Sequence, residues 1–378
     1  MEAAVKKQTI FFLICLFAII NFDLLADDKA KDNIKIDTTA SRMIVHAPVA
    51  NVRLCPKKVN ICKLGKKTDK RPRCSQILFG EKVWGKDQKN SDEVHVRLVI
   101  QKRFDGKKWV GIPGFVNKDK LSKVLAFPQY TAILQDHLTP LYVSMNSNKK
   151  PLMYLSMGTL LETKEVNNHW QKITLNGKKY YIPNKTNILK LSCKVETNTD
   201  TIRKNIVNTA LQFLNTPYVY GGRSFFNKNT KKPKTGVDCS GLINLAYLAG
   251  AGLVIPRTSR NQKRNCTILK KASELKAGDL IFFAKNDLTQ RVVHVAMYIG
   301  NGKMIESSGS KDANKKKIGV RIITVEEKIG VPFDSIESEK TVTKTGKLIF
   351  LGTCLQSHKK IKKMRSLLFQ EPSNPFIC

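Results

Sequence analysis

The segment Val237-Asp238-Cys239-Ser240-Gly241 constrains the fold more than any other feature of the chain. The apolar run Leu242–Leu248 that follows predicts a buried helix, and Gly250-Ala251-Gly252 predicts its C-terminal cap. Cys239 stands at the expected helix start, where unpaired backbone N–H groups and the helix dipole stabilise a thiolate. A cysteine that only fills a core lies more often on the apolar face, so we interpret Cys239 as a nucleophile.

A histidine follows in a strand-like segment, because His294 lies within the β-branched run Val292–Gly300. A cysteine at a helix start followed by a histidine on a strand is the order of nucleophile and base in papain-like enzymes. We therefore predict a cysteine peptidase or amidase. A helix is expected from Thr199 to about Leu214, and further strands follow at 279–283, 303–307 and 347–352. Helices followed by strands indicate an α+β, papain-like fold.

The first residues have the pattern of a targeting signal. Lys6 and Lys7 precede the apolar run Ile10–Ile20, and Leu24-Leu25-Ala26 offers a small residue for cleavage. The run is shorter than the about 20 residues that span a bilayer, which favours a cleaved signal peptide. We predict a signal peptide over residues 1–26, a linker over 27–40, and export to the periplasm, the cell envelope or the medium. An uncleaved anchor is the alternative.

The charge is strongly positive: 66 Lys and Arg residues against 30 Asp and Glu residues give a net charge of +36. The basic residues are scattered along the whole chain and no nucleic-acid motif is present, so we predict no nucleic-acid partner. For an exported protein, anionic polymers of the envelope are the expected partners. Compositional drift toward Lys, Asn and Ile is an equally weighted alternative.

The chain has nine cysteines. Cys15 lies in the predicted signal and Cys239 is the predicted nucleophile, and the remaining seven cannot all pair within one chain. Cys55, Cys62 and Cys74 lie close in sequence, and one disulfide among them is possible, although the sequence does not say which two pair. Their spacing resembles no zinc site, so we predict no metal and no cofactor.

The region 41–127 has short alternating strands with Gly and Pro punctuation, which indicates a small β-barrel. It resembles bacterial SH3-like domains, in which an Asn-Val-Arg strand, a Leu-Phe-Gly-Glu turn and a Pro-Gly-aromatic-Val strand recur. Here these are Asn51–Arg53, Leu78–Glu81 and Pro113–Val116. The region 128–192 has a weaker pattern of the same kind. We predict two small all-β SH3-like barrels ahead of the catalytic domain.

Five blocks occur in the order and spacing of the NlpC-type cysteine peptidases of bacterial cell walls. They are Thr216–Ser224, Asp238–Leu242, Pro256–Gln262, Ala277–Phe283 and His294–Gly300. The chain is most similar to the γ-D-glutamyl-L-diamino acid endopeptidases, and the resemblance implies peptidoglycan stem peptides or muropeptides as substrates. It also implies a catalytic domain over 193–356. We expect a basic, poorly ordered tail over 357–378 and a monomeric protein.

The resemblance implies the catalytic roles. Cys239 attacks the scissile carbonyl, and His294 shares its proton and later protonates the leaving amine. The family commonly has His, sometimes Asn or Gln, twelve positions after the base, where this chain has Glu306. A carboxylate there orients the imidazole as in other triads. The alternative is that Glu306 is a solvated strand residue.

The resemblance also implies residues that hold the free N-terminal amine of the substrate. Asp238 and Ser240 flank the nucleophile, and the first β domain supplies a Glu, for which Glu81 is the candidate. Ser259 and Tyr218 are further candidates for substrate contact. An aromatic residue is expected where this chain has Ile112, which is a departure from the pattern.

Three alternatives stay open at this stage. The first is a general amidase or hydrolase that acts on intact peptidoglycan. The second is an acyltransferase on the same fold, although such relatives generally lack tandem SH3-like domains. The third is a non-catalytic envelope-binding protein with a degenerate peptidase domain. Intact Cys239 and His294 argue against it, and Glu306 is its only support.

Overall fold

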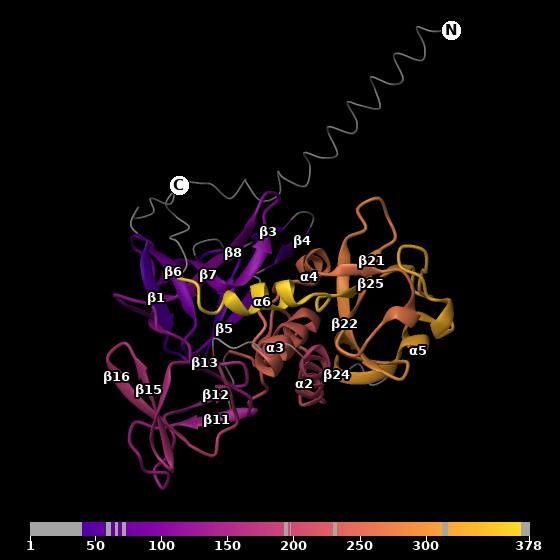
Figure 1. Ribbon diagram of the computed structural model, residues 1–378. Helices are drawn as coiled ribbons and strands as arrows, with labels where there is room; N and C mark the ends of the chain where they lie inside the picture. The colour runs from indigo at the N-terminus through magenta and orange to yellow at the C-terminus, as the bar shows by residue number, and fades with distance from the viewer. Residues whose placement is uncertain are drawn as a thin grey trace, which may run out of the picture.

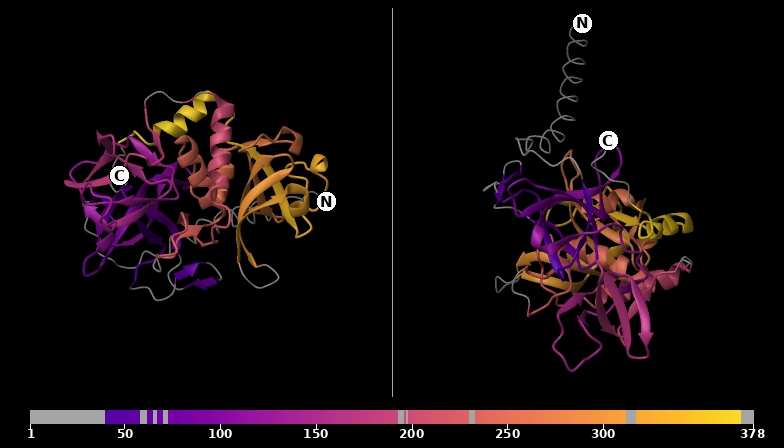
Figure 2. Two further views of the ribbon diagram at one scale, coloured as in Figure 1. Left: turned by 90° about the horizontal axis from the view of Figure 1, so that it is seen from below. Right: turned by 90° about the vertical axis from the view of Figure 1, so that its left-hand side faces the viewer.

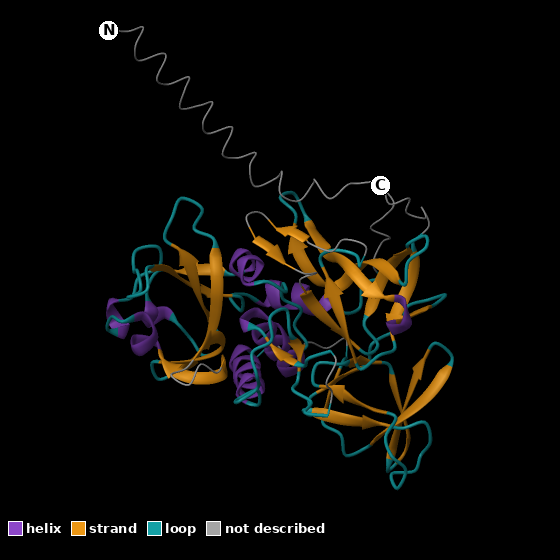
Figure 3. Cartoon of the chain, turned by 180° about the vertical axis from the view of Figure 1, so that it is seen from behind, coloured by secondary structure: helices purple, strands orange, loops and turns teal. Residues whose placement is uncertain are grey.

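The computed structural model describes residues 40–57, 62–64, 67–69, 73–192, 196, 198–229, 233–311 and 317–371. The predicted signal peptide, and the predicted linker up to residue 39, lie outside these residues. Among the described residues, no helix is long and apolar enough to cross a membrane. The helices α2 (Thr199–Leu211) and α3 (Cys239–Ala251) lie between two β regions on one side and a six-stranded sheet on the other (Figure 1, Figure 3).

The first β region, residues 41–123, is built around an antiparallel sheet in the order β5-β2-β8-β7-β6-β1-β9. The predicted alternation along residues 93–99 is confirmed, because Val94, Val96 and Leu98 are buried within one strand. The strands are β1 (Ser41–Val45), β2 (Val49–Arg53), β3 (Cys62–Leu64), β4 (Lys67–Asp69), β5 (Arg73–Leu78), β6 (Lys82–Asp87), β7 (Glu93–Phe104), β8 (Trp109–Asn117) and β9 (Leu121–Lys123), with a 3-10 turn η1 (Lys118–Lys120).

The second β region, residues 132–190, consists of three small sheets, β13-β10-β17, β11-β12 and β14-β15-β16. Its apolar side chains, among them Leu155 and Met157, share one core with Leu245 of the central helix. The strands are β10 (Ala132–Leu134), β11 (Leu138–Leu141), β12 (Met153–Ser156), β13 (Leu160–Leu161), β14 (Thr163–Asn167), β15 (Trp170–Leu175), β16 (Lys178–Pro183) and β17 (Ile188–Lys190).

The C-terminal domain, residues 198–371, confirms the predicted order of helices followed by strands. Helices α2 and α3 pack against each other, and α3 packs on the sheet β20-β25-β21-β22-β23-β24. A buried ion pair of 2.8 Å between Arg203 and Asp279 ties α2 to the start of β21. The elements are α2 (Thr199–Leu211), β18 (Arg223–Ser224), β19 (Gly236–Val237), α3 (Cys239–Ala251), α4 (Ser259–Asn265), β20 (Thr267–Leu269), η2 (Ala272–Glu274), β21 (Leu280–Lys285), β22 (Val292–Gly300), β23 (Lys303–Lys311), β24 (Lys317–Thr324), α5 (Val325–Ile329), η3 (Phe333–Ser335), β25 (Lys347–Thr353) and α6 (His358–Ser366).

The prediction of a poorly ordered basic tail is wrong for residues 358–369. Residues His358–Ser366 of this segment form α6, which begins at the capping side chain of Ser357 and lies beside the end of α3 (Figure 2). Ile361, Met364 and Leu368 are buried. Ile361 and Met364 are three residues apart, which puts them on one face of α6 between the lysines, and burying that face stabilises the helix. Arg365 donates to the carbonyl of Ala251 at 2.9 Å, at the end of α3.

The structure pairs Cys266 with Cys354, a disulfide between the end of α4 and the end of β25. The sequence left the pairing open and did not single out these two residues. Cys55 is also in a disulfide, whereas Cys74 is free. The distant pair could not be read from spacing, since 88 residues separate the two cysteines and the sheet brings them together.

Candidate active site

Cys239 is the first residue of α3 and is a free, half-buried cysteine. Asp238 is the N-cap, and its Oδ1 accepts from the backbone N–H of Gly241 at 2.6 Å. The cap fixes the helix start, so the sulfur lies beside the positive end of the helix dipole. Gly252 adopts a left-handed conformation at the other end, which confirms the predicted C-cap.

His294 on β22 and Glu306 on the neighbouring strand β23 meet directly. The His294 Nε2 lies 2.6 Å from Glu306 Oε2. Burial disfavours the imidazolium, but hydrogen bonds to Cys239 and Glu306, together with the charges of both, outweigh it and raise the pKa of His294 to about 9. Because Glu306 takes Nε2, Nδ1 is the nitrogen available to the sulfur. The structure therefore aligns sulfur, imidazole and carboxylate.

Glu306 is wholly buried rather than solvated, which contradicts the alternative reading of this residue. Burial alone would raise its pKa, but the hydrogen bond from His294 and the charges of His294 and Lys328 hold the pKa of this carboxyl well below its usual range. The site thus contains an ionised carboxylate behind the imidazole, a state that suits the acceptor of a catalytic triad.

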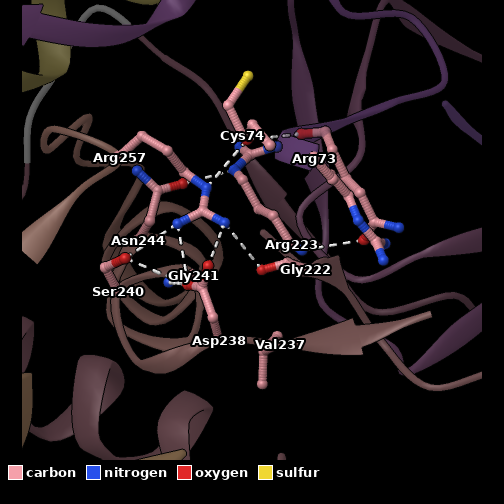
Figure 4. A network of polar contacts seen from close by, with 12 residues as sticks. Arg73, Cys74, Gly222, Arg223, Val237, Asp238, Ser240, Gly241, Asn244 and Arg257 are labelled. Atoms are coloured by element: carbon pink, nitrogen blue, oxygen red, sulfur yellow. Dashed lines mark hydrogen bonds and ion pairs between the residues drawn. The ribbon is translucent and has the colours of Figure 1, made fainter. Parts of the chain in front are cut away.

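Arg257, to which the sequence assigned no role, binds the side chains of the two residues that flank Cys239 (Figure 4). Its Nη1 and Nη2 each lie 2.9 Å from one carboxylate oxygen of Asp238, and Nη1 also lies 3.0 Å from the Ser240 hydroxyl. Its Nε donates to Ser75 of the first β region at 2.9 Å, and Nη2 donates to the Gly222 carbonyl. Arg257 lies in the matching block Pro256–Gln262, and this position was the sequence evidence from which a role could have been predicted.

Asp238 and Ser240 lie on either side of Cys239, within a buried hydrogen-bond network. Ser259 begins α4 and is half-buried. Tyr218 is half-buried in the loop after α2, with its ring against Gly309 of β23. Burial, followed by the charge of Cys239, raises the pKa of Tyr218, which indicates that its ring lies near the sulfur.

The prediction that Glu81 contacts a substrate is contradicted. The carboxylate is 1% exposed and forms an ion pair of 2.5 Å with Arg223 of β18. It also accepts from the Leu78 backbone and from Gln101. A buried carboxylate needs compensating partners, and here the protein itself supplies them. Glu81 therefore holds the first β region to the C-terminal domain.

Among the described residues, no group of three or more His, Cys, Asp or Glu side chains is arranged to hold a metal ion. The arrangement at Cys239 instead provides a sulfur nucleophile, a charged imidazole and a carboxylate acceptor. These are the components of nucleophilic acyl transfer.

Residues 215–328 match the model of the NlpC/P60 family. The chain is 29% identical over 238 residues to a gamma-D-glutamyl-L-lysine dipeptidyl-peptidase of Bacillus cereus, covering 62% of this chain and 66% of that protein. It is 29% identical over 234 residues to the Bacillus subtilis protein of the same name, covering 62% of this chain and 71% of that protein. A shorter match, 36% over 107 residues, is to the bifunctional muramidase/DL-endopeptidase CwlT of Bacillus subtilis, covering 28% of this chain and 30% of that protein.

The fold is similar to the crystal structure of an NlpC/P60 family protein from Bacillus cereus, with a TM-score of 0.59 and 24% identity. The superposition covers 75% of this chain and 94% of that chain, so the likeness extends beyond the matched family segment. Three observations point to the same family: the order of the sequence blocks, the arrangement of Cys239, His294 and Glu306, and the match to the family model. Residues 215–328 of this chain are therefore similar to the NlpC/P60 family in sequence, and the described chain is similar to one of its members in fold.

Proposed function

We propose that this protein is a cysteine endopeptidase that hydrolyses γ-D-glutamyl-diamino acid bonds in peptidoglycan stem peptides or muropeptides. The observation that carries the proposal is the line from the Cys239 sulfur through His294 to Glu306, on a chain similar to the named dipeptidyl-peptidases over about two thirds of their length.

In this proposal the Cys239 thiolate attacks the scissile carbonyl and the backbone N–H of Cys239 meets the developing oxyanion. His294 then gives its proton to the leaving amine, and water hydrolyses the thioester with the same imidazole as base. Glu306 keeps Nε2–H of the imidazole oriented and stabilises the imidazolium without taking its proton.

The free N-terminal amine of the substrate is assigned to Asp238. Its Oδ1 accepts from Gly241, Ser240 and Arg257, whereas among the described residues Oδ2 accepts from Arg257 alone. Oδ2 is therefore the oxygen that can accept a further hydrogen bond from an ammonium group. Ser240, Ser259 and Tyr218 are proposed to complete the contacts to the substrate.

We also propose that residues 41–127 and 128–192 are SH3-like modules, that 193–356 is the catalytic domain, and that an N-terminal signal over 1–26 exports the protein to the envelope. The all-β content of both regions and the extended structural match support the division. A monomer and binding to anionic envelope polymers are further proposals, the latter supported by the net charge of +36.

The test is incubation of the chain without residues 1–26 with L-Ala-γ-D-Glu-diamino acid tripeptide, with or without an N-acetyl group, followed by mass analysis. We expect release of the diamino acid from the free peptide and a large loss of kcat/KM on acetylation, which removes the ammonium charge and leaves a desolvated carboxylate short of a partner. Cys239→Ala is the inactive control. Equal rates on both peptides would favour a general wall hydrolase, and no cleavage of either would refute the proposal.

A further inference from the structure

The carboxylate behind His294 is surrounded by positive charge. Arg321 donates through Nε and Nη2 to Glu306 Oε1, at 3.0 and 2.9 Å. Lys328 Nζ lies 2.9 Å from Oε1 and 2.8 Å from Oε2, so it bridges both oxygens. His294 Nε2 also hydrogen-bonds to Oε2. One wholly buried carboxylate is thus held by two full cations in addition to the imidazole.

The fold brings these residues together from three elements. Glu306 on β23 and Arg321 on β24 are directly opposite in the antiparallel register, and Lys328 reaches over from α5. The Arg321 and Lys328 side chains are 34% and 22% exposed, whereas that of Glu306 is 0% exposed. The cations therefore connect the buried carboxylate to the protein surface.

Glu306 could fail as the partner of the imidazole in two opposite ways, by becoming protonated or by holding the imidazolium proton too strongly. Burial favours its protonated form, and a protonated Glu306 would no longer stabilise an imidazolium. A fully charged and unscreened carboxylate would instead hold the imidazolium proton too firmly for transfer to a leaving group. A carboxylate paired with cations avoids both outcomes, because it stays ionised while part of its field is cancelled.

We propose that Arg321 and Lys328 are positioning residues for the hydrolysis, which keep Glu306 ionised with Oε2 directed at His294 and limit how strongly it holds the imidazolium proton. This inference rests on the proposed function, in which His294 is the general base and acid. No local sequence pattern assigns a role to either residue, because the contact of both with Glu306 depends on strand register and on the position of α5.

The titratable and charged groups near His294 differ between the elements that pack around the imidazole. Tyr218 lies near the sulfur of Cys239, and β21 contributes the uncharged ring of Phe283. Helix α4 packs on β22, but the charged ends of its Lys263 and Arg264 lie over the rings of Phe350 and Phe104. The charges that act directly on the imidazole therefore come from Cys239 and Glu306, and Arg321 and Lys328 act on it through Glu306.

The experiment is the pH dependence of Cys239 alkylation by iodoacetamide, followed by mass analysis of the peptide that contains Cys239. The profile has two limbs, one that reports the protonation of Cys239 and one that reports the protonation of His294. Loss of a nearby positive charge favours the protonated form of every neighbouring group. Lys328→Gln should therefore move both limbs to higher pH, by about 0.5 pH unit or more. Arg321→Gln should act in the same direction, Glu306→Gln should move both limbs to lower pH, and Lys328→Arg should restore the original profile.

The control variant is Lys303→Gln, which removes the same charge from an exposed position at the start of β23. We expect it to leave the profile unchanged. On the tripeptide, Lys328→Gln should lower kcat by about tenfold with a smaller change in KM, since the lost effect concerns proton transfer.

Unmoved limbs in both Lys328→Gln and Arg321→Gln, or an equal shift in Lys303→Gln, would overturn the proposal. Arg321 is the more exposed partner, so its variant provides the answer if Lys328→Gln does not fold. Alkylation requires no substrate. A protein that fails to cleave the tripeptide but shows the predicted shifts would refute the proposed substrate and leave this inference standing.

Discussion

The first and second β regions meet the C-terminal domain through different chemistry. Both regions share an apolar core with that domain, and the first region adds charged and strongly polar groups: Glu81 pairs with Arg223, and Ser75 accepts from Arg257. The second region uses apolar packing and neutral hydrogen bonds, such as Ser156 to the backbone N–H of Phe225 at 2.7 Å.

The difference shows which β region the candidate site depends on. Arg257 connects Ser75 to Asp238, and Asp238 caps the helix that begins with Cys239. The first region is thus part of the support of the nucleophile. The second region supports the far side of α3, where Gln135 donates to the carbonyl of Ala249. A buried charge left unpaired costs more than a lost neutral contact, so the two junctions should respond differently to substitution.

The largest effect is expected from Glu81→Ala. The substitution leaves the buried Arg223 guanidinium without its charged partner, which should lower the free energy of unfolding by about 3–5 kcal/mol. Thermal unfolding followed by calorimetry measures the loss. Glu165→Ala, on an exposed strand of the second region, is the matched control with an expected change of less than about 0.5 kcal/mol. Similar losses in the two variants would remove the contrast between the junctions.

Ser75→Ala should come next. It removes the acceptor for Arg257 Nε and should cost about 1–3 kcal/mol, the range for a buried donor left unsatisfied. We also expect kcat on the tripeptide to fall more than KM rises, because Asp238 then caps the Cys239 helix less firmly. Ser122→Ala, which removes a hydroxyl bonded to His46 within the first region, is the control and should retain full activity. Unchanged kinetics in Ser75→Ala would separate the first region from the site.

Ser156→Ala makes the same substitution at the second junction. It leaves the Phe225 N–H unpaired and should cost about 1 kcal/mol, with kcat unchanged. Comparison of kcat in Ser75→Ala and Ser156→Ala therefore separates support of the nucleophile from general packing. A fall in kcat for Ser156→Ala as large as that for Ser75→Ala would contradict the distinction.

The smallest effect is expected from Gln135→Ala. The side chain is half-buried and its partner is a helix carbonyl, so the loss should be about 0.5–1 kcal/mol, measurable by urea unfolding. Activity should be unchanged. A loss above about 2 kcal/mol, outside the usual range for one neutral hydrogen bond, would show that this contact orders the second junction.

Local patterns determined most of the elements and part of the candidate site. The apolar run after Cys239, the β-branched run around His294 and the Gly252 cap predicted α3, β22 and the helix end correctly, because each depends on near neighbours in sequence. The twelve-residue spacing also put Glu306 on the neighbouring strand within hydrogen-bonding distance of His294, since two strands joined by a tight turn have a fixed register.

Other parts depended on tertiary structure. Sequence reasoning assigned Glu81 to a substrate, whereas the junction between domains buries it against Arg223, 142 residues away. The lysine-rich composition of residues 358–366 suggested a disordered tail, but α3 offers its end and an apolar surface to Ile361 and Met364.

The sequence by itself thus determined the helix that begins at Cys239 and the strand that carries His294, the candidate nucleophile and base. Only the tertiary structure decided what neutralises each carboxylate: Arg257 at Asp238, Arg223 at Glu81, and Arg321 with Lys328 at Glu306. The physical reason is that helix and strand periodicity extends over a few residues, whereas a buried charge is compensated by whichever distant group the fold brings within hydrogen-bonding distance.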